Sequence, residues 1–192
     1  MRLILLNGPP RSGKDTALGI IAKNEKALNL GMVRHIMMAE PLKDACHSFM
    51  GTRPENDKAK DLSMPFTEKT WRQFYIAMSE TCAKPFFGVD IFGRIAAEQM
   101  NNPTHTYVVS DAGFHEEVVP MVRKAGGRNT LLVNLSRPGT SFANDSRGYL
   151  HVDHIERLTN SRVEQCQIDN RHTLEMYEAE LVMRIEQWRT KA

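Results

Sequence analysis

The chain has 192 residues, of which 41% are hydrophobic and 25% are charged, the composition of a soluble globular protein that can bury a core. Its net charge of +2 permits contact with nucleic acid without arguing for it, because dedicated DNA-binding domains are more basic. The three cysteines form no CxxC pair, which argues against a disulfide framework or a zinc site and favours a reducing cytosol. No apolar run approaches the ~20 residues that span a bilayer, so we expect no membrane partner.

Apolar runs typical of buried parallel strands alternate along the chain with helical patterns. The expected strands are residues 2–6, 33–38, 106–110, 131–135 and, more weakly, 165–169. The expected helices are residues 14–24, 40–50, 67–83, 89–101, 114–125 and 173–190. This order predicts an α/β fold, a parallel five-stranded sheet flanked by helices, in a single domain spanning 1–192.

Two polar segments interrupt the alternation of strands and helices. Residues 51–66 are rich in turn-forming residues and lead into two helices with no strand between them, whereas residues 136–149 are rich in Gly, Ser, Asn and Arg. Loops of this length in a compact domain are usually functional or disordered. We therefore expect a helical substrate-binding insert at about 51–100 and an arginine-bearing lid at about 136–150.

A phosphate-binding loop stands between the first expected strand and the first expected helix. The sequence GPPRSGK at 8–14 fits G-x-x-x-x-G-K, in which backbone N–H groups surround the phosphates and the lysine reaches the β- and γ-phosphates. The motif predicts ATP and Mg²⁺ as cofactors, with Lys14 as a catalytic residue. The residues expected to bind ATP are Gly8, Arg11, Ser12, Gly13, Lys14, Asp15 and Thr16.

Asp15 stands where such loops normally carry Ser or Thr as a magnesium ligand. A carboxylate at this place can bind Mg²⁺ directly or through water, or take a proton from an acceptor hydroxyl. In a third interpretation Thr16 supplies the metal ligand and Asp15 caps the helix. The sequence leaves these roles open.

Several segments together are similar to bacteriophage deoxynucleoside monophosphate kinases, whose loop also reads R-S-G-K-D-T. The similar segments are GPPRSGKDT at 8–16, AEPLKDA at 39–45, WRQFYIAMSETCAKPFFGVDIFGRIAAEQM at 71–100, LLVNLSRPG at 131–139 and CQIDNRHTLEMYEAEL at 166–181. The resemblance spans nearly the whole chain. It implies a P-loop kinase fold, the use of ATP, and the cytoplasm of a phage-infected bacterial host.

The resemblance also implies roles for residues outside the loop. Arg137 and Arg147 are expected in the lid, where an arginine neutralises charge as the γ-phosphoryl group moves; the alternative is a surface arginine. Asp111 ends a strand, where open α/β sheets place functional carboxylates; the alternative is a cap for the helix beginning at Phe114. The expected substrate-binding residues are Lys43, Arg72, Arg94 and Phe114.

The segment VVSDAGFHEE departs from the resembling families. The phage kinases carry an arginine two residues after the carboxylate, where this chain has Gly113, and adenylate-kinase-like proteins carry one where it has His115. Either that arginine clamp on the acceptor phosphate has moved, to Arg72 or Arg94, or the acceptor presents a hydroxyl instead. In the second case Asp111 is the expected general base, and Gly113 leaves room for a bulky acceptor.

A related phage activity fits the second case: kinases similar to these phosphorylate 5-hydroxymethyluracil already incorporated in DNA, a step of thymine hypermodification. We expect this acceptor first, with DNA containing the modified base as the partner. The alternatives are a deoxynucleoside monophosphate kinase making a diphosphate from its substrate and ATP, a kinase of free nucleosides or other small acceptors, and a non-catalytic ATP-binding module. Residues of the insert that would hold DNA, or else pack as core or surface, are Arg53, Lys58, Lys60, Trp71, Arg72, Phe74, Phe86 and Phe87.

The sequence HVDH places His151 and His154 on either side of Asp153. It invites a metal hypothesis, but no further ligand stands at a matching spacing. The pattern favours instead a polar helix start after the lid.

Overall fold

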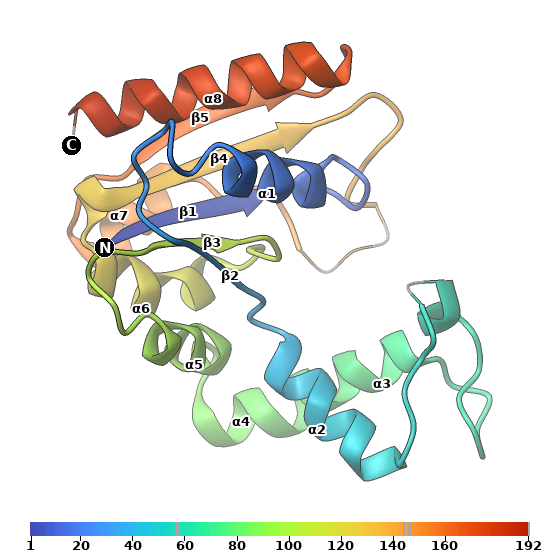
Figure 1. The fold of residues 1–192 in the computed structure, drawn as a ribbon. Helices are drawn as coiled ribbons and strands as arrows, with labels where there is room; N and C mark the ends of the chain where they lie inside the picture. Colours follow the sequence, from blue (N-terminus) through green and yellow to red (C-terminus); the bar gives the residue numbers. More distant parts are fainter. Residues whose placement is uncertain (57, 144, 146, 192) are drawn as a thin grey trace. The chain divides into compact units, whose positions relative to one another are not determined.

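A computed structural model describes residues 1–56, 58–143, 145 and 147–191. The chain forms two compact units, one made of residues 1–38 and 93–192 and the other of residues 39–92. The first unit contains a five-stranded parallel sheet in the order β2-β3-β1-β4-β5 (Figure 1). Its strands are β1 (Arg2–Asn7), β2 (Val33–Ile36), β3 (Thr106–Val109), β4 (Thr130–Ser136) and β5 (Glu164–Asp169).

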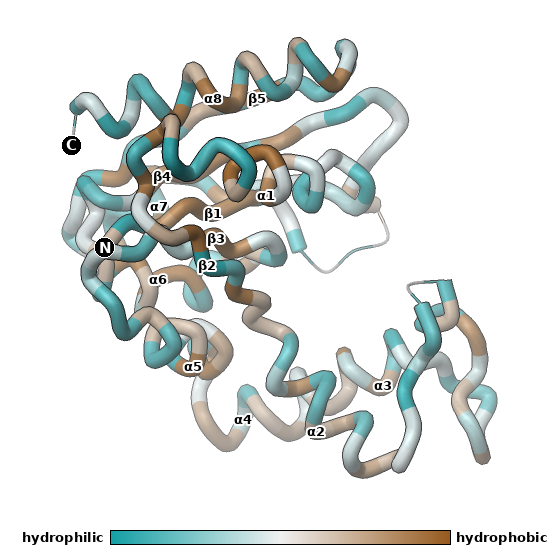
Figure 2. The backbone as a smooth tube through the Cα atoms, viewed as in Figure 1, coloured by the Kyte–Doolittle hydropathy of each residue, from teal (hydrophilic) through white to brown (hydrophobic). Residues whose placement is uncertain are grey.

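Helices cover both faces of this sheet. On one face α1 (Lys14–Lys23) and α8 (Leu174–Lys191) share a buried core with β1, β4 and β5. On the other face α6 (His115–Ala125) packs on β1 and on α7 (Val152–Thr159) (Figure 1). Apolar residues concentrate along the strands, as the brown segments of Figure 2 show. The central strands therefore read as continuous hydrophobic runs because both of their faces are buried.

The five strands run in one direction, so their carboxyl ends lie along one edge of the sheet. Asn7 at the end of β1 pairs with Asn134, and Ser136 at the end of β4 pairs with Asp169. The segments that follow the strands begin at this edge, the place where open α/β sheets bind ligands. They include the phosphate loop after β1, Asp111 after β3 and the lid segment after β4.

The second unit is helical and has its own small core of Cys46, Met64, Trp71 and Tyr75. A capping box begins α3, since the Thr70 side chain accepts from the Gln73 backbone and the Gln73 side chain accepts from the Thr70 backbone. Its elements are α2 (Glu40–Met50), the 3₁₀ turn η1 (Lys58–Asp61), α3 (Trp71–Ala77), the π-helical turn η2 (Met78–Ala83) and α4 (Lys84–Phe87). The helix α5 (Ile91–Gln99) begins at the end of this unit and continues in the first, and η3 (Gly127–Asn129) precedes β4.

The fold class expected from the sequence is confirmed, and each expected strand is present with ends shifted by at most a few residues. The helix expected at 67–83 begins at Trp71 and changes to a π-helical turn at Met78. Periodicity does not foresee such a turn, because π-helical turns are rare and the apolar pattern is compared with the α-helical period. The single-domain organisation, with its insert and lid, stays a prediction beside the two units described here.

Candidate functional site

The phosphate loop has the backbone that its sequence predicts. Gly13 is the N-cap of α1 with a φ of 105°, and Arg11 also adopts a left-handed φ, of 66°. A Cβ atom on Gly8 would collide with the Leu135 carbonyl oxygen and with Ser12 Oγ, and one on Gly13 would collide with Asn170. Glycine is thus required at both ends of the loop, where the chain turns back toward its neighbours.

Lys14 folds back over its own loop. Its Nζ donates hydrogen bonds of 2.6 Å to the Gly8 carbonyl and 2.7 Å to the Pro9 carbonyl. Burial lowers the pKa of Lys14 to about 8, and the positive charge of Arg147 acts in the same direction. Acidic side chains that oppose this shift are Asp15, Asp145 and Asp111. The expected catalytic groups Lys14, Asp111 and Arg147 therefore share one electrostatic environment.

The loop contains a buried polar atom suited to a phosphate oxygen. Ser12 is fully buried, and its Oγ has no hydrogen-bond partner within the described part of the chain. Such an atom is costly unless a ligand or water satisfies it. Together with the glycines and the backbone N–H groups at the start of α1, it makes the loop fit the phosphates of ATP.

Two residues that sequence reasoning did not assign to the site hold the loop from the far end of the chain. Asn170 Nδ2 donates to the Ser12 carbonyl at 3.1 Å, and Tyr177 Oη donates to the Gly13 carbonyl at 3.1 Å. Both residues lie within the segment of family resemblance at 166–181, which was the one signal that could have found them.

Asp15 and Thr16 are both exposed in the first turn of α1. The N-cap is Gly13 and makes no side-chain capping bond, so the interpretation of Asp15 as a helix cap is wrong. Oxygen ligands that are open to solvent suit Mg²⁺, which keeps several of its waters. The metal and base roles of these two residues stay predictions.

Asp111 follows β3 and connects it to the end of β2, because its Oδ1 accepts a hydrogen bond of 3.0 Å from the Met38 backbone N–H. The N-cap of α6 is Phe114, without a side-chain capping bond, so the interpretation of Asp111 as a helix cap is also wrong. Its carboxylate is half-buried at the carboxyl edge of the sheet. This is a suitable position for a general base or a metal ligand.

Gly113 does not leave open space, which corrects the expectation drawn from the sequence. A Cβ atom built on Gly113 would lie 2.5 Å from both Cγ and Cδ of Arg147, and 2.7 Å from its Cβ. The stem of the arginine fills the volume above the glycine. Gly113 and Arg147 are far apart in sequence but complementary in shape. Their spacing along the chain does not predict this contact.

The lid segment runs from Arg137 to the start of α7. Arg137 is exposed, and its carbonyl accepts hydrogen bonds from the Thr140 backbone and hydroxyl. Arg147 is partly buried, and its Nε and Nη2 donate to the Asp145 carboxylate at 2.8 and 2.5 Å. The structure thus places Arg147, but not Arg137, among the charges that act on Lys14. The catalytic roles expected for both arginines stay predictions.

Buried amides fix the last residues of the lid segment, and sequence reasoning missed them. Asn7 Nδ2 donates to the carbonyl oxygens of Ala112 and Gly148, at 2.9 and 3.0 Å, while its Oδ1 accepts from the Leu150 N–H at 2.9 Å. Asn134 Nδ2 donates to the Leu150 carbonyl at 3.1 Å. Polar residues at the ends of buried strands were the signal that could have found them.

The expected substrate-binding residues are divided between the two units. Lys43 lies on α2 and Arg72 on α3, where Arg72 Nε donates to Asp61 at 2.7 Å. Arg94 lines a groove of about 640 Å³ between α5 and α6, and Phe114 precedes α6. Their contacts with an acceptor stay predictions.

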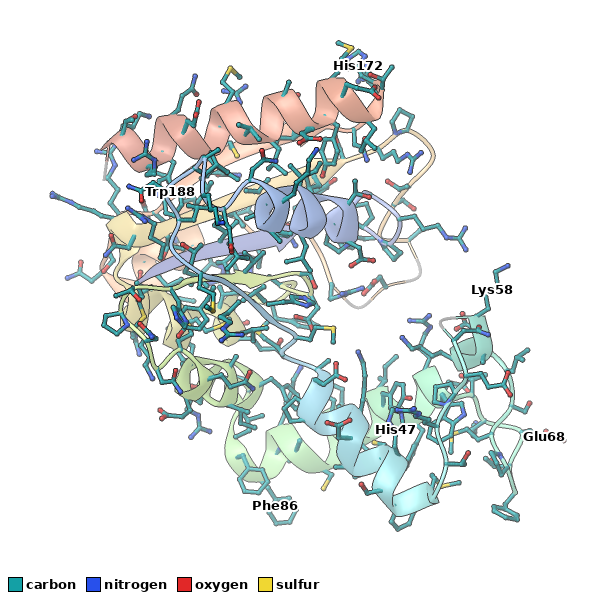
Figure 3. The ribbon with its side chains drawn as sticks, in the orientation of Figure 1. His47, Lys58, Glu68, Phe86, His172 and Trp188 are labelled. Carbon is teal, nitrogen blue, oxygen red and sulfur yellow. The ribbon has the colours of Figure 1, made fainter. Side chains whose placement is uncertain are left out.

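The second unit offers exposed aromatic rings but no excess of positive charge. Trp71 is buried in its core, as the core interpretation proposed, whereas Phe86 and Phe87 are 80% and 60% exposed (Figure 3). Residues 39–92 carry seven Lys and Arg against eight Asp and Glu, a net charge of −1. Attraction to a nucleic-acid backbone would therefore depend on individual cations rather than on the charge of this unit.

Three histidines gather where α6 and α7 begin. The ring of His115 stacks on His154 with centroids 4.3 Å apart, and the His151 backbone N–H donates to His115 Nε2 at 2.9 Å. Burial, followed by the nearby His154, lowers the pKa of His115. In the part of the chain that the structure describes, no cluster of three or more His, Cys, Asp or Glu could hold a metal ion. The helix-start interpretation of HVDH holds, since α7 begins at Val152.

No described helix is both long enough and apolar enough to span a membrane. No family model matches this chain, and neither does any curated protein. A gluconokinase from Sinorhizobium meliloti 1021 is similar in structure, with 13% identity, coverage of 99% of this chain and 94% of that chain, and a TM-score of 0.46. Chaetomium thermophilum Kti12 in complex with ADP-AlF3 is similar with 12% identity, coverage of 96% and 97%, and a TM-score of 0.45. Similarity this distant carries no argument about activity; the P-loop α/β fold rests on the chain's own sheet and loop.

Proposed function

We propose that this protein is an ATP-dependent kinase that transfers the γ-phosphoryl group to a hydroxyl acceptor at the carboxyl edge of its sheet. The observation that carries the proposal is that Arg147 packs against Gly113, two residues after Asp111, while the charges of Asp111 and Arg147 both act on Lys14. A phosphate-binding lysine, a carboxylate and an arginine are thereby brought together. Phosphoryl transfer depends mainly on positioning and on neutralising charge, and these three groups supply both.

ATP would place its phosphates in the loop at 8–14, where Lys14 would exchange the carbonyl oxygens of Gly8 and Pro9 for phosphate oxygens. The buried hydroxyl of Ser12 would gain a partner in the same step. Asp15 and Thr16 are the residues that would hold Mg²⁺, which neutralises charge on the triphosphate when bound.

The acceptor hydroxyl would give its proton to the Asp111 carboxylate while its oxygen bonds to the γ-phosphorus. The bond between that phosphorus and the bridging oxygen of ATP breaks, and ADP leaves. Arg147 would stabilise the negative charge spread over the transferred group. No atoms or electrons beyond those of ATP and the acceptor are needed.

The best-supported acceptor is the hydroxymethyl group of 5-hydroxymethyluracil in DNA. Its support is Gly113, two residues after Asp111, where the resembling monophosphate kinases have the arginine that binds an acceptor phosphate. A hydroxyl acceptor needs no such clamp but gains from a base at Asp111. A base inside a duplex would have to leave its stack to reach this edge.

A second candidate is a deoxynucleoside monophosphate kinase. It is favoured by the stem of Arg147, which fills the volume above Gly113. Arg147 could then bind the acceptor phosphate in place of the arginine that the resembling kinases have at this position. An arginine from the lid would bind the acceptor phosphate in place of one from the strand end.

One reaction separates the two acceptors. The protein is incubated with γ-labelled ATP, Mg²⁺, an oligonucleotide containing hydroxymethyluracil and the common deoxynucleoside monophosphates, and the products are resolved by size. Label on the oligonucleotide, absent from a matched thymine oligonucleotide and from Lys14→Ala, is the expected result. Label in a deoxynucleoside diphosphate would establish the second candidate, and label in neither product would overturn both.

A further inference from the structure

Packing against Arg147, and not the backbone conformation, requires glycine at position 113. It is absent from the residues with positive φ, so any residue type could adopt its conformation. The three atoms nearest to a Cβ built on it all belong to Arg147, at 2.5, 2.5 and 2.7 Å. Real Cβ contacts are not this short, so a side chain at 113 would displace the arginine stem.

The backbones on both sides of this contact are tied to one buried side chain. Asn7 is fully buried and donates to the carbonyl oxygens of Ala112 and Gly148, the neighbours of Gly113 and Arg147 in sequence. It also accepts from the Leu150 N–H. A single amide therefore sets the separation between the strand end and the lid segment.

The far end of Arg147 is held by an ion pair. The guanidinium is bound by Asp145, which orients it, and 26% of the side chain is exposed. Its positive charge acts on Lys14, the lysine of the phosphate loop. An arginine oriented in advance loses less conformational freedom when it meets a phosphoryl group.

We propose that Gly113 and Asn7 are positioning residues that hold Arg147 beside Lys14, so that the glycine exists to accept the arginine stem and not to admit the acceptor. The inference rests on the proposed kinase function and deepens it. It names the residues that position Arg147, the arginine proposed to stabilise the transferred phosphoryl group, and it holds for either of the two acceptors. Gly113 and Arg147 then act as one unit in catalysis, and their substitutions are not additive.

The test is a double-mutant cycle on ATP turnover, with ADP release measured in the presence of the acceptors and ATP affinity measured separately by calorimetry. We expect Arg147→Ala to lower kcat by about 10³-fold, the order of magnitude that a transfer arginine contributes. Gly113→Ala should lower kcat at least about tenfold, and the double variant should match Arg147→Ala within about twofold. The ATP affinity should change little in all three.

Gly148→Ala is the matched control. It makes the same chemical change one residue from Arg147, but a Cβ there meets no atom within 4 Å, the residue lacks a positive φ, and its carbonyl stays in place for Asn7. It should retain wild-type kcat. Asn7→Ala should lower the melting temperature with or without Arg147, yet lower kcat only when Arg147 is present, which a purely structural role would not do.

Additive losses in the Gly113→Ala, Arg147→Ala double variant would overturn this inference while leaving the kinase function intact. Equal losses in Gly148→Ala and Gly113→Ala would overturn it as well, because stiffening of the backbone would then explain both. A wild-type protein that turns over no ATP with any acceptor would overturn the proposed function and the inference together.

Discussion

Asn170, in the turn after β5, donates a hydrogen bond of 3.1 Å from Nδ2 to the carbonyl oxygen of Ser12 in the phosphate loop, across a separation of 158 residues. Tyr177 on α8 makes a second such bond to Gly13. The carbonyl groups of Ser12 and Gly13 are thus bonded by residues from the end of the chain, which fixes the loop ahead of the N-terminus of α1. Residues near the end of the chain therefore help to hold the phosphate loop, which is formed by residues near its beginning.

Removing the hydroxyl of Tyr177 should weaken ATP binding. Tyr177→Phe deletes one hydrogen bond to the loop, and a bond of this kind contributes about 0.5–1.5 kcal/mol. We expect the Kd for ATP, measured by calorimetry, to rise about two- to twelvefold. Tyr107→Phe is the control, since Tyr107 lies on β3 and its Oη accepts a hydrogen bond from the backbone N–H of Asn102 instead of donating one to the phosphate loop. An equal effect of the two variants on ATP affinity would contradict a specific role for Tyr177.

The affinity for ATP should fall as the pH rises through about 8. Burial and the charge of Arg147 lower the pKa of Lys14 to about 8 in the free protein, so the lysine loses its proton above that pH. Phosphate binding requires the charged form of Lys14, so above this pH the lysine must take up a proton before ATP binds. Calorimetry in buffers of different ionisation enthalpy would measure that uptake. Lys14→Arg, which stays charged, should show a flat profile, and a sloping one would count against Lys14 as the titrating group.

Asp111→Asn tests the general base. The amide keeps an oxygen that can accept from the Met38 N–H, so the junction of β2 and β3 should survive. With a hydroxyl acceptor we expect kcat to fall by about 10²–10⁴-fold, the usual contribution of general-base catalysis, while the ATP affinity stays within about twofold. Exposed Asp153→Asn on α7 is the control. Mild losses on the preferred acceptor, similar to those of the control, would exclude Asp111 as the base.

The histidine group, made of His115, His151 and His154, should make the stability of the fold fall at acidic pH. Because burial and His154 lower the pKa of His115 from its usual 6.5, with Glu116 opposing and His151 adding to the shift, the unfolded chain takes up a proton that the folded chain refuses. The contribution of His115 to the free energy of unfolding is therefore greatest above about pH 6.5 and declines as the pH falls below it.

Urea unfolding at pH 7.5 and 5.5 measures this contribution. His115→Asn should lose less stability between the two pH values than the wild type, whereas His172→Asn should behave as the wild type does. His172 is exposed between β5 and α8 (Figure 3). A variant at His115 with an unchanged pH dependence would show that another group titrates.

The strands and the phosphate loop could be predicted from the amino-acid sequence alone, because the signal for each is local. A buried parallel strand is a continuous apolar run, and a loop that surrounds a phosphate needs Gly8, Gly13 and Lys14 at fixed spacing. Asp111 was also within reach, since a carboxylate directly after a buried strand is a recognisable pattern. The lid expected from the length and composition of the segment after β4 stays a prediction.

The surroundings of these groups became known from the three-dimensional fold. The contact between Gly113 and Arg147, the amide of Asn7 between strand end and lid, and the bonds from Asn170 and Tyr177 to the loop all join positions that no periodicity relates. Sequence spacing records which face of an element a residue occupies, but not which distant residue it meets there. The space expected above Gly113 was an inference from a missing side chain, and the fold fills that space with another residue.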